Sequence, residues 1–201
     1  MAWHHLATPS NPKVALMAQT GTAETRLVVL RGNSGSGKST VATLLRDRIG
    51  RGVAWVEQDY IRRILLREDD KPDATNIGLL SHTVRYALDA GYHVILEGIL
   101  KSSRYATMLT ELTADHRGTT SHFYFDVPFE ETVRRHSFRA QRNAFTADDM
   151  REWFEPLDLL PSLDQRIVPA TSAAVETVEI IFEQMRFEGL ARAGTPPSAS
   201  R

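Results

Sequence analysis

The chain has 201 residues, of which 42% are hydrophobic and 24% charged, and its formal net charge is −1. This length and apolar content suffice for one full core and favour a single domain. The near-neutral charge gives no overall attraction to nucleic acid, the absence of cysteine excludes disulfides and thiolate metal sites, and no apolar run is long enough to cross a membrane. We expect a cytoplasmic protein.

Both ends of the chain are expected to be loose tails. Residues 1–25 contain two prolines and scattered polar residues, without the charged-then-apolar layout of a signal peptide. Residues 191–201 consist mainly of small residues and proline. The folded domain is therefore expected to cover residues 26–190.

The first predicted element is a buried strand that leads into a glycine-rich loop. Leu27 to Leu30 is a continuous aliphatic run, and residues 32–40 read GNSGSGKST. The spacing G-x-x-x-x-G-K-[ST] is a phosphate-binding pattern in which Lys38 contacts the β- and γ-phosphates and the Ser39 hydroxyl ligates Mg²⁺. Helix-spaced apolar residues follow from Val41 to Ile49, so the loop joins a strand to a helix. We expect ATP and Mg²⁺ to bind at Gly32, Asn33, Ser34, Gly35, Ser36, Gly37, Lys38, Ser39 and Thr40.

Strand and helix patterns alternate through the rest of the chain. Further buried strands are predicted at 53–56, 94–96, 122–125 and 166–168, and helices at 77–90, 102–112, 130–142, 146–154 and 172–187. A short amphipathic helix is also expected after Asp59, with Ile61, Ile64 and Leu65 on one face. The alternation predicts an α/β fold, a three-layer sandwich whose five-stranded parallel sheet carries helices on both faces.

In such sheets ligands bind beyond the carboxyl ends of the strands, so the residues that follow each strand are candidates for the site. Asp59 follows the second predicted strand and would orient and deprotonate an acceptor hydroxyl, or else cap the helix that it begins. Arg62 lies one turn further on and is either a contact for a substrate anion or a solvated surface arginine.

Two more carboxylates end predicted strands. Glu97 follows three aliphatic residues, where a carboxylate is costly unless it meets a cation, water or donor. We therefore expect it to meet the Mg²⁺ hydration shell or the acceptor hydroxyl, with a structural hydrogen bond as the alternative. Asp126 precedes Val127-Pro128 and is interpreted as a cap of the next helix.

That next helix is strongly basic. Arg134, Arg135, Arg139 and Arg142 occur within it, and Arg135 and Arg139 are spaced i, i+4, which stacks them on one face. Such a face is often merely solvated. After the fourth strand of a phosphate-binding domain, however, it predicts a short helical lid over about residues 134–155 that brings guanidinium groups onto the transferring phosphate.

Four segments resemble the P-loop kinase group that includes phage-type polynucleotide kinase, chloramphenicol phosphotransferase and zeta-toxin sugar-nucleotide kinases. They are GNSGSGKST, VEQDYIRR, VILEG and FYFDVPFEETVRRHSFRAQRNAF, and the resemblance covers about residues 26–187. It implies a P-loop nucleoside triphosphate hydrolase fold of the kinase type.

The resemblance also implies roles for single residues. By similarity to polynucleotide kinase, Asp59 is the general base, Arg62 contacts substrate, and Arg135 and Arg139 contact phosphate. By similarity to zeta toxins, Glu97 helps to hold the substrate. The turn at residues 169–172 would lie near the adenine.

The sequence thus predicts an ATP-dependent kinase that phosphorylates a hydroxyl of a small molecule of the nucleoside, antibiotic or sugar-nucleotide type. A polynucleotide 5′-hydroxyl kinase is the alternative, although the near-neutral chain offers no long basic track. A non-kinase ATPase is disfavoured because the third strand ends in Glu97-Gly98 rather than Asp-Glu, and a GTPase because no Asn-Lys-x-Asp segment occurs. The acceptor and the oligomeric state stay open.

Overall fold

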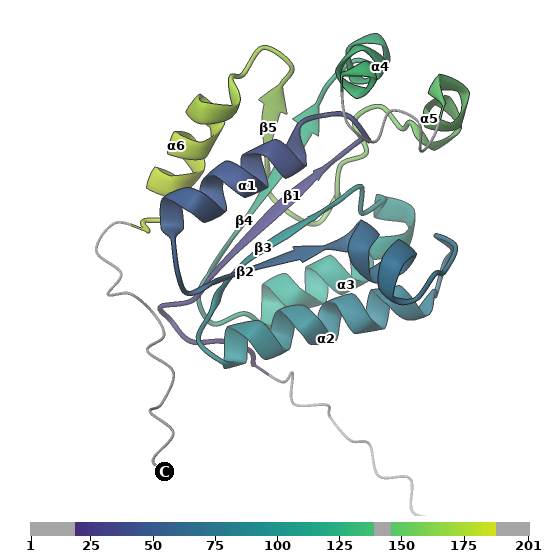
Figure 1. The fold of residues 1–201 in the computed structure, drawn as a ribbon. Coiled ribbons are helices and arrows are strands. Elements are labelled where there is room, and N and C mark those ends of the chain that lie inside the picture. The colour runs from purple at the N-terminus through teal and green to yellow at the C-terminus, as the bar shows by residue number, and fades with distance from the viewer. Residues whose placement is uncertain (1–18, 139–145, 188–201) are drawn as a thin grey trace, which may run out of the picture.

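A computed structural model describes residues 19–138 and 146–187 of the chain. Its centre is a sheet of five parallel strands in the order β2-β3-β1-β4-β5 (Figure 1). The strands are β1 Arg26–Gly32, β2 Val53–Glu57, β3 His93–Gly98, β4 Thr119–Asp126 and β5 Gln165–Pro169. Each lies where an apolar run predicts it, and each is slightly longer than that run. The predicted fold class is confirmed.

The register of the sheet brings polar strand ends together. Glu57 of β2 pairs with Glu97 of β3, while Gly32 at the end of β1 pairs with Phe125 of β4. Leu27 to Leu30 of β1 and Val94 to Leu96 of β3 are fully buried between two helical layers, so the accessible polar groups of these strands lie at their ends. The polar residues that follow the strands therefore face a common region.

Two pairs of helices cover the two faces of the sheet (Figure 1). On one face, α1 Lys38–Ile49 packs with α6 Ala174–Gln184, and their buried side chains join Val28 and Leu30 of β1. On the other face, α2 Thr75–Asp89 and α3 Ser102–Asp115 join Leu27 and Val29. Successive side chains of β1 point to opposite faces of the sheet and therefore join two separate hydrophobic cores, as expected for a strand with both faces covered.

Helices α4 Phe129–Ser137 and α5 Ala147–Trp153 lie beyond the carboxyl ends of the strands (Figure 1). The α5 helix begins with a capping box, in which Thr146 and Asp149 bond each other's backbone. The prediction that Asp126 caps α4 is wrong, because Pro128 occupies the N-cap position and no side chain caps the helix. The predicted continuation of α4 to Arg142 lies outside the described residues.

The segment after Asp59 differs from the predicted helix. It forms η1, a π-helix over Tyr60–Leu65, in which Leu66 N donates to Ile61 O across five residues at 3.0 Å. The wider turn no longer stacks residues three and four apart, so Ile61 is buried while Ile64 and Leu65 stay 65% and 59% exposed. The prediction of one shared apolar face is wrong for the latter two.

Across residues 19–138 and 146–187, the helices are too short or too polar to cross a bilayer.

Candidate active site

Two glycines of the phosphate loop pack closely against β4 and α4. Gly32 and Gly35 adopt φ of 139° and 80°, which side chains rarely tolerate. A Cβ atom on Gly32 would lie 2.7 Å from the carbonyl oxygen of Phe125, and one on Gly35 would lie 2.6 Å from that of Thr132. These glycines therefore let β4 and α4 approach the loop, besides leaving its backbone N–H groups accessible.

Lys38 begins α1 and points back into the loop. Its side chain is nearly buried, and Nζ donates to Asn33 O at 2.8 Å and to Ser36 Oγ at 3.3 Å. No side chain caps the helix, and no acidic residue occupies its first turn. The first N–H groups of α1 and the lysine charge consequently face the same hollow, an arrangement that suits the binding of an anion.

Three carboxylates gather on the other side of Lys38. Glu57, Asp59 and Glu97 line a hollow of about 100 Å³ together with Lys38 and Ser39, and Ser39 Oγ donates to Glu97 Oε1 at 3.3 Å. Burial, reinforced by the charges of Glu97 and Asp59, raises the pKa of Glu57. A divalent cation would relieve this crowding of negative charge, so the residues fit the expected Mg²⁺.

The described residues do not supply a complete metal cage by themselves. Within the described ranges, no three histidine, aspartate or glutamate side chains are placed to hold an ion together. A cation here would thus take ligands from Ser39, water and the phosphates of a nucleotide, as Mg²⁺ commonly does.

A larger pocket of about 600 Å³ opens beside this hollow, between η1, the start of α3 and α5. Its lining includes Ser34 of the phosphate loop, Ile99, Trp153, and charged side chains of both signs. The cations are Arg62, Arg63, Arg67, Lys101 and Arg104, and the anions are Asp59, Glu68, Asp69, Asp70 and Glu152. We call this the acceptor pocket, after the role that we propose for it.

Asp59 and Arg62 lie together at the mouth of the acceptor pocket. Arg62 Nη2 donates to Asp59 Oδ1 at 3.0 Å, whereas Asp59 makes no cap bond to η1. Arg62 Nε is buried and has no hydrogen-bond partner in the structure. Asp59 and Arg62 are thus held by their contact with each other, and the Nε–H group of Arg62 has no partner among the described residues.

A third pocket of about 420 Å³ lies on the opposite side of the phosphate loop. The expected turn after β5 borders it through Pro169 and Ser172, and Gly37 and Thr40 border it from the loop. Apolar atoms of Val41, Phe125 and Val168 complete its floor. A hollow with this lining, adjacent to an anion site, suits a nucleoside.

Arg135 joins that pocket to the phosphate loop. Its guanidinium donates to Ser36 O at 2.9 Å, to Ala170 O at 2.8 Å and to Glu131 Oε1 at 2.7 Å. Arg134 instead pairs twice with Glu131 and is largely exposed. Hydrogen bonds from these two arginines lower the pKa of Glu131 to about 2. The other predicted phosphate contact, Arg139, lies outside the described residues.

The sequence did not predict a buried hydrogen-bond network next to Asp59. The neighbouring Gln58 donates from Nε2 to the Tyr105 hydroxyl at 2.8 Å and accepts from Leu100 N at 3.2 Å. Tyr105 also reaches Asp70 and Asn76, and burial raises its pKa. In the sequence, Gln58 is recognisable only as a polar residue between the predicted strand and Asp59. This position does not identify partners so distant in the chain.

The strand order, the glycine-rich loop and the hollows around it define the P-loop kinase group. The sequence profile of the family AAA_33, described as AAA domain, matches residues 27–157, and the chain belongs to that family. A shikimate kinase of Streptomyces coelicolor is 28% identical over 170 residues, which are 77% of this chain and 96% of the relative.

Solved structures share the same fold. The APS kinase of Mycobacterium tuberculosis superposes with a TM-score of 0.62 at 21% identity, covering 84% of this chain and 99% of that one. A gluconokinase of Sinorhizobium meliloti gives 0.51 at 19% identity, covering 85% and 94%. The predicted membership of the P-loop kinase group is confirmed.

Proposed function

We propose that this protein transfers the γ-phosphate of ATP to a hydroxyl group of a small molecule bound in the acceptor pocket. The observation that carries the proposal is the position of Asp59, which lines both the acceptor pocket and the hollow that contains Lys38 and Ser39. A carboxylate at that junction lies between the expected donor and acceptor of the phosphoryl group.

The donor side would be held by the phosphate loop. Lys38 would exchange its bonds to Asn33 and Ser36 for bonds to the β- and γ-phosphates, and Arg135 would meet the phosphates from α4. Ser39 would hold Mg²⁺, with Glu97 acting on the hydrated ion. When bound, Mg²⁺ neutralises charge on the β- and γ-oxygens. The nucleoside would occupy the pocket beside Pro169 and Ser172.

The chemical step needs little from the protein beyond orientation and a proton acceptor, because the transition state of phosphoryl transfer is loose. The acceptor oxygen forms a bond to the γ-phosphorus while the bond from that phosphorus to the ADP oxygen breaks. Asp59 would take the hydroxyl proton as the new bond forms. Arg62, bonded to Asp59, would aim the carboxylate and contact the acceptor.

The charges of the acceptor pocket favour a small acceptor over a polynucleotide. Its lining holds five cationic side chains and five carboxylates, and ion pairs join Arg62 to Asp59 and Arg104 to Asp70. A strand carrying several phosphates would meet these carboxylates and be repelled, whereas a small polar molecule can use both signs. The names of the relatives point the same way, since shikimate kinase, APS kinase and gluconokinase all denote small-molecule acceptors.

The test measures phosphate transfer from labelled ATP to nucleosides, sugar nucleotides, antibiotics, shikimate, APS and gluconate, with a 5′-hydroxyl oligonucleotide in parallel. Each assay runs at about 50 and 200 mM salt, because binding through several phosphates weakens by orders of magnitude over that range. We expect turnover of a small molecule with little salt dependence. Salt-sensitive labelling of the oligonucleotide alone would favour the polynucleotide kinase instead.

Binding of ATP is tested separately from the acceptor. Calorimetry with ATP and Mg²⁺ should show binding to the natural chain, and Lys38→Ala should abolish turnover because the loop loses its one built-in full charge. Arg46→Ala, which removes an exposed cation from the last turn of the same helix, is the matched control. Equal turnover by Lys38→Ala and Arg46→Ala would contradict the proposed phosphate site.

A further inference from the structure

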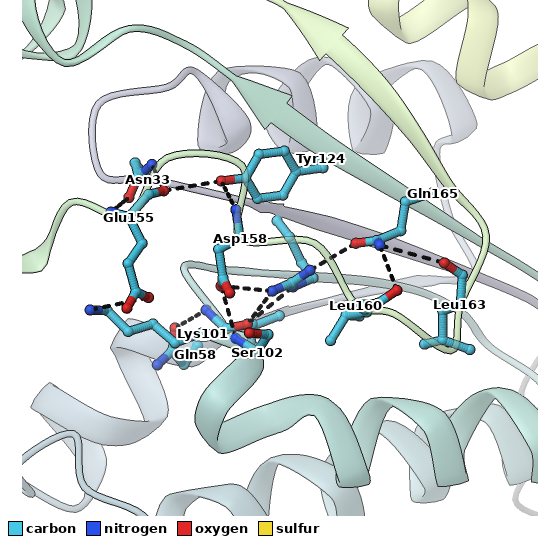
Figure 2. Close-up of polar contacts among 12 residues, drawn as sticks. Asn33, Gln58, Lys101, Ser102, Tyr124, Glu155, Asp158, Leu160, Leu163 and Gln165 are labelled. Carbon is cyan, nitrogen blue, oxygen red and sulfur yellow. Dashed lines mark hydrogen bonds and ion pairs between the residues drawn. The ribbon is translucent and has the colours of Figure 1, made fainter.

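Asn33 makes a contact that the chemistry of the phosphate loop does not require. Its side-chain amide bonds both backbone groups of Glu155, with Nδ2 donating to Glu155 O at 2.7 Å and Oδ1 accepting from Glu155 N at 3.0 Å. Figure 2 shows these two residues side by side. Only a carboxamide can accept and donate in this way, because aspartate lacks the donor and serine the reach.

Glu155 follows α5 almost directly, so this contact fixes the end of that helix. Glu152 and Trp153 of α5 line the acceptor pocket. The Glu155 carboxylate also lies 3.5 Å from Lys101 Nζ, and Lys101 borders the same pocket from the start of α3. One segment therefore touches the phosphate loop on one side and the acceptor pocket on the other.

The chain just beyond Glu155 is tightly anchored. The Tyr124 hydroxyl donates to Glu155 O at 3.3 Å and accepts from Asp158 N at 3.0 Å. Asp158 Oδ2 accepts from the buried guanidinium of Arg31 at 3.0 Å and from Ser102 N at 2.8 Å (Figure 2). These bonds hold the chain from Glu155 to Asp158, so α5, which precedes Glu155, is the part of the segment that a displacement of Asn33 would move.

Lys38 would make the contact between Asn33 and Glu155 sensitive to a bound nucleotide. Its Nζ donates to the backbone oxygen of Asn33 at 2.8 Å, and a bound triphosphate would compete for the same ammonium group. Binding of a triphosphate to the loop would thus change the hydrogen bonding of Asn33, whose side chain holds Glu155.

We propose that Asn33 is a positioning residue that links the occupied phosphate loop to the α5 wall of the acceptor pocket. The link rests on the proposed function, because it needs a triphosphate in the loop. Through it, ATP would set the position of Glu152 and Trp153 before the acceptor is phosphorylated. Binding of ATP favours binding of the acceptor only if ATP stabilises the conformation of the acceptor pocket that the acceptor binds more tightly.

The test follows Trp153 in the full chain with Trp3 and Trp55 replaced by phenylalanine, which leaves Trp153 as the only indole. Mg²⁺ with the non-hydrolysable analogue AMP-PNP is titrated while calorimetry records binding. We expect the Trp153 emission to change in step with the heat. In Asn33→Ala we expect most of the emission change to be lost, while AMP-PNP affinity falls by about thirtyfold or less, since the two hydrogen bonds that are lost are worth only about 1 kcal/mol each.

Two further variants separate positioning from folding. Glu155→Gln keeps both backbone bonds to Asn33 and should retain the Trp153 response, whereas Asn33→Asp keeps the size of the side chain but lacks the Nδ2 donor and should lose it. A full response in both Asn33 variants, or binding heat without any response in the parent chain, overturns the link. Absence of AMP-PNP binding in every variant would instead overturn the ATP site and, with it, the link.

Discussion

At the scale of single residues, Asp59 can be separated from the stability of the helix that it precedes. It makes an ion pair with Arg62 and no cap bond to η1. We expect Asp59→Asn to lower kcat by about 10²- to 10⁴-fold, the usual contribution of a general base. The affinity for ATP and the melting temperature should change little, because the substitution is nearly isosteric and removes no cap.

Steady-state kinetics and thermal melting of Asp59→Asn decide this prediction. Asp47→Asn, which neutralises an exposed carboxylate on α1, is the matched control. Full kcat together with early melting would mean that Asp59 serves the fold rather than the chemistry.

A second residue-scale prediction concerns the buried ion pair of Arg31 and Asp158. The Arg31 side chain is fully inaccessible, and its Nη2 lies 3.0 Å from Asp158 Oδ2, while burial lowers its pKa. Removing the partner of a buried charge costs about 3–5 kcal/mol. We expect Asp158→Asn to lower the free energy of unfolding by that order, as measured by urea denaturation.

The control for this substitution is Asp164→Asn, which neutralises an exposed carboxylate six residues along the chain. It should change the free energy of unfolding by less than about 0.5 kcal/mol, as surface substitutions usually do. Similar losses in both variants would show that the loss of negative charge, rather than the buried pair, determines the effect.

At the scale of secondary structure, the π-helical turn of η1 predicts unequal roles for two isoleucines that an ordinary helix would bury together. Ile61 is 5% exposed and Ile64 is 65% exposed. Ile61→Ala should cost about 2–5 kcal/mol, the range for truncating a buried isoleucine. Ile64→Ala should stay within about 0.5 kcal/mol. Chemical denaturation of the two variants compares them directly, and equal losses would indicate α-helical spacing after Asp59.

At the scale of the whole molecule, buried histidines predict a loss of stability in mild acid. Burial, reinforced by Arg26 for His116 and by Arg31 for His122, lowers the pKa of each ring from 6.5 to about 4. Because the unfolded chain then binds more protons than the folded one below pH 6.5, stability falls as the pH drops from about 6.5 to 4. Each pKa unit corresponds to about 1.4 kcal/mol per ring.

Urea denaturation at several pH values between 4 and 7 measures this loss. In His122→Gln the fall in the free energy of unfolding should be smaller, since one titrating ring is gone. His82→Gln changes an exposed ring and is the comparison. An unaltered pH profile in His122→Gln would rule out this histidine as a cause.

The sequence predicted the features that depend on local patterns. The aliphatic run of β1 and the spacing of the phosphate loop are sufficient for the strand and the loop, and the alternation of strand and helix patterns is sufficient for the order of the elements. It could not predict contacts between distant residues. Asn33 and Glu155 are 122 residues apart, and Arg31 is buried although its type and its place after an apolar run indicate exposure.

The order of the strands has a consequence for solubility. Among the described residues, β2 and β5 pair with a strand on one side only, and such edge strands invite pairing with other molecules. Here both edges are only five residues long. β5 also carries the exposed Arg166 and ends at Pro169, which has no N–H to donate. The shortness of both edges, together with the charge and the terminal proline of β5, disfavours strand-to-strand aggregation.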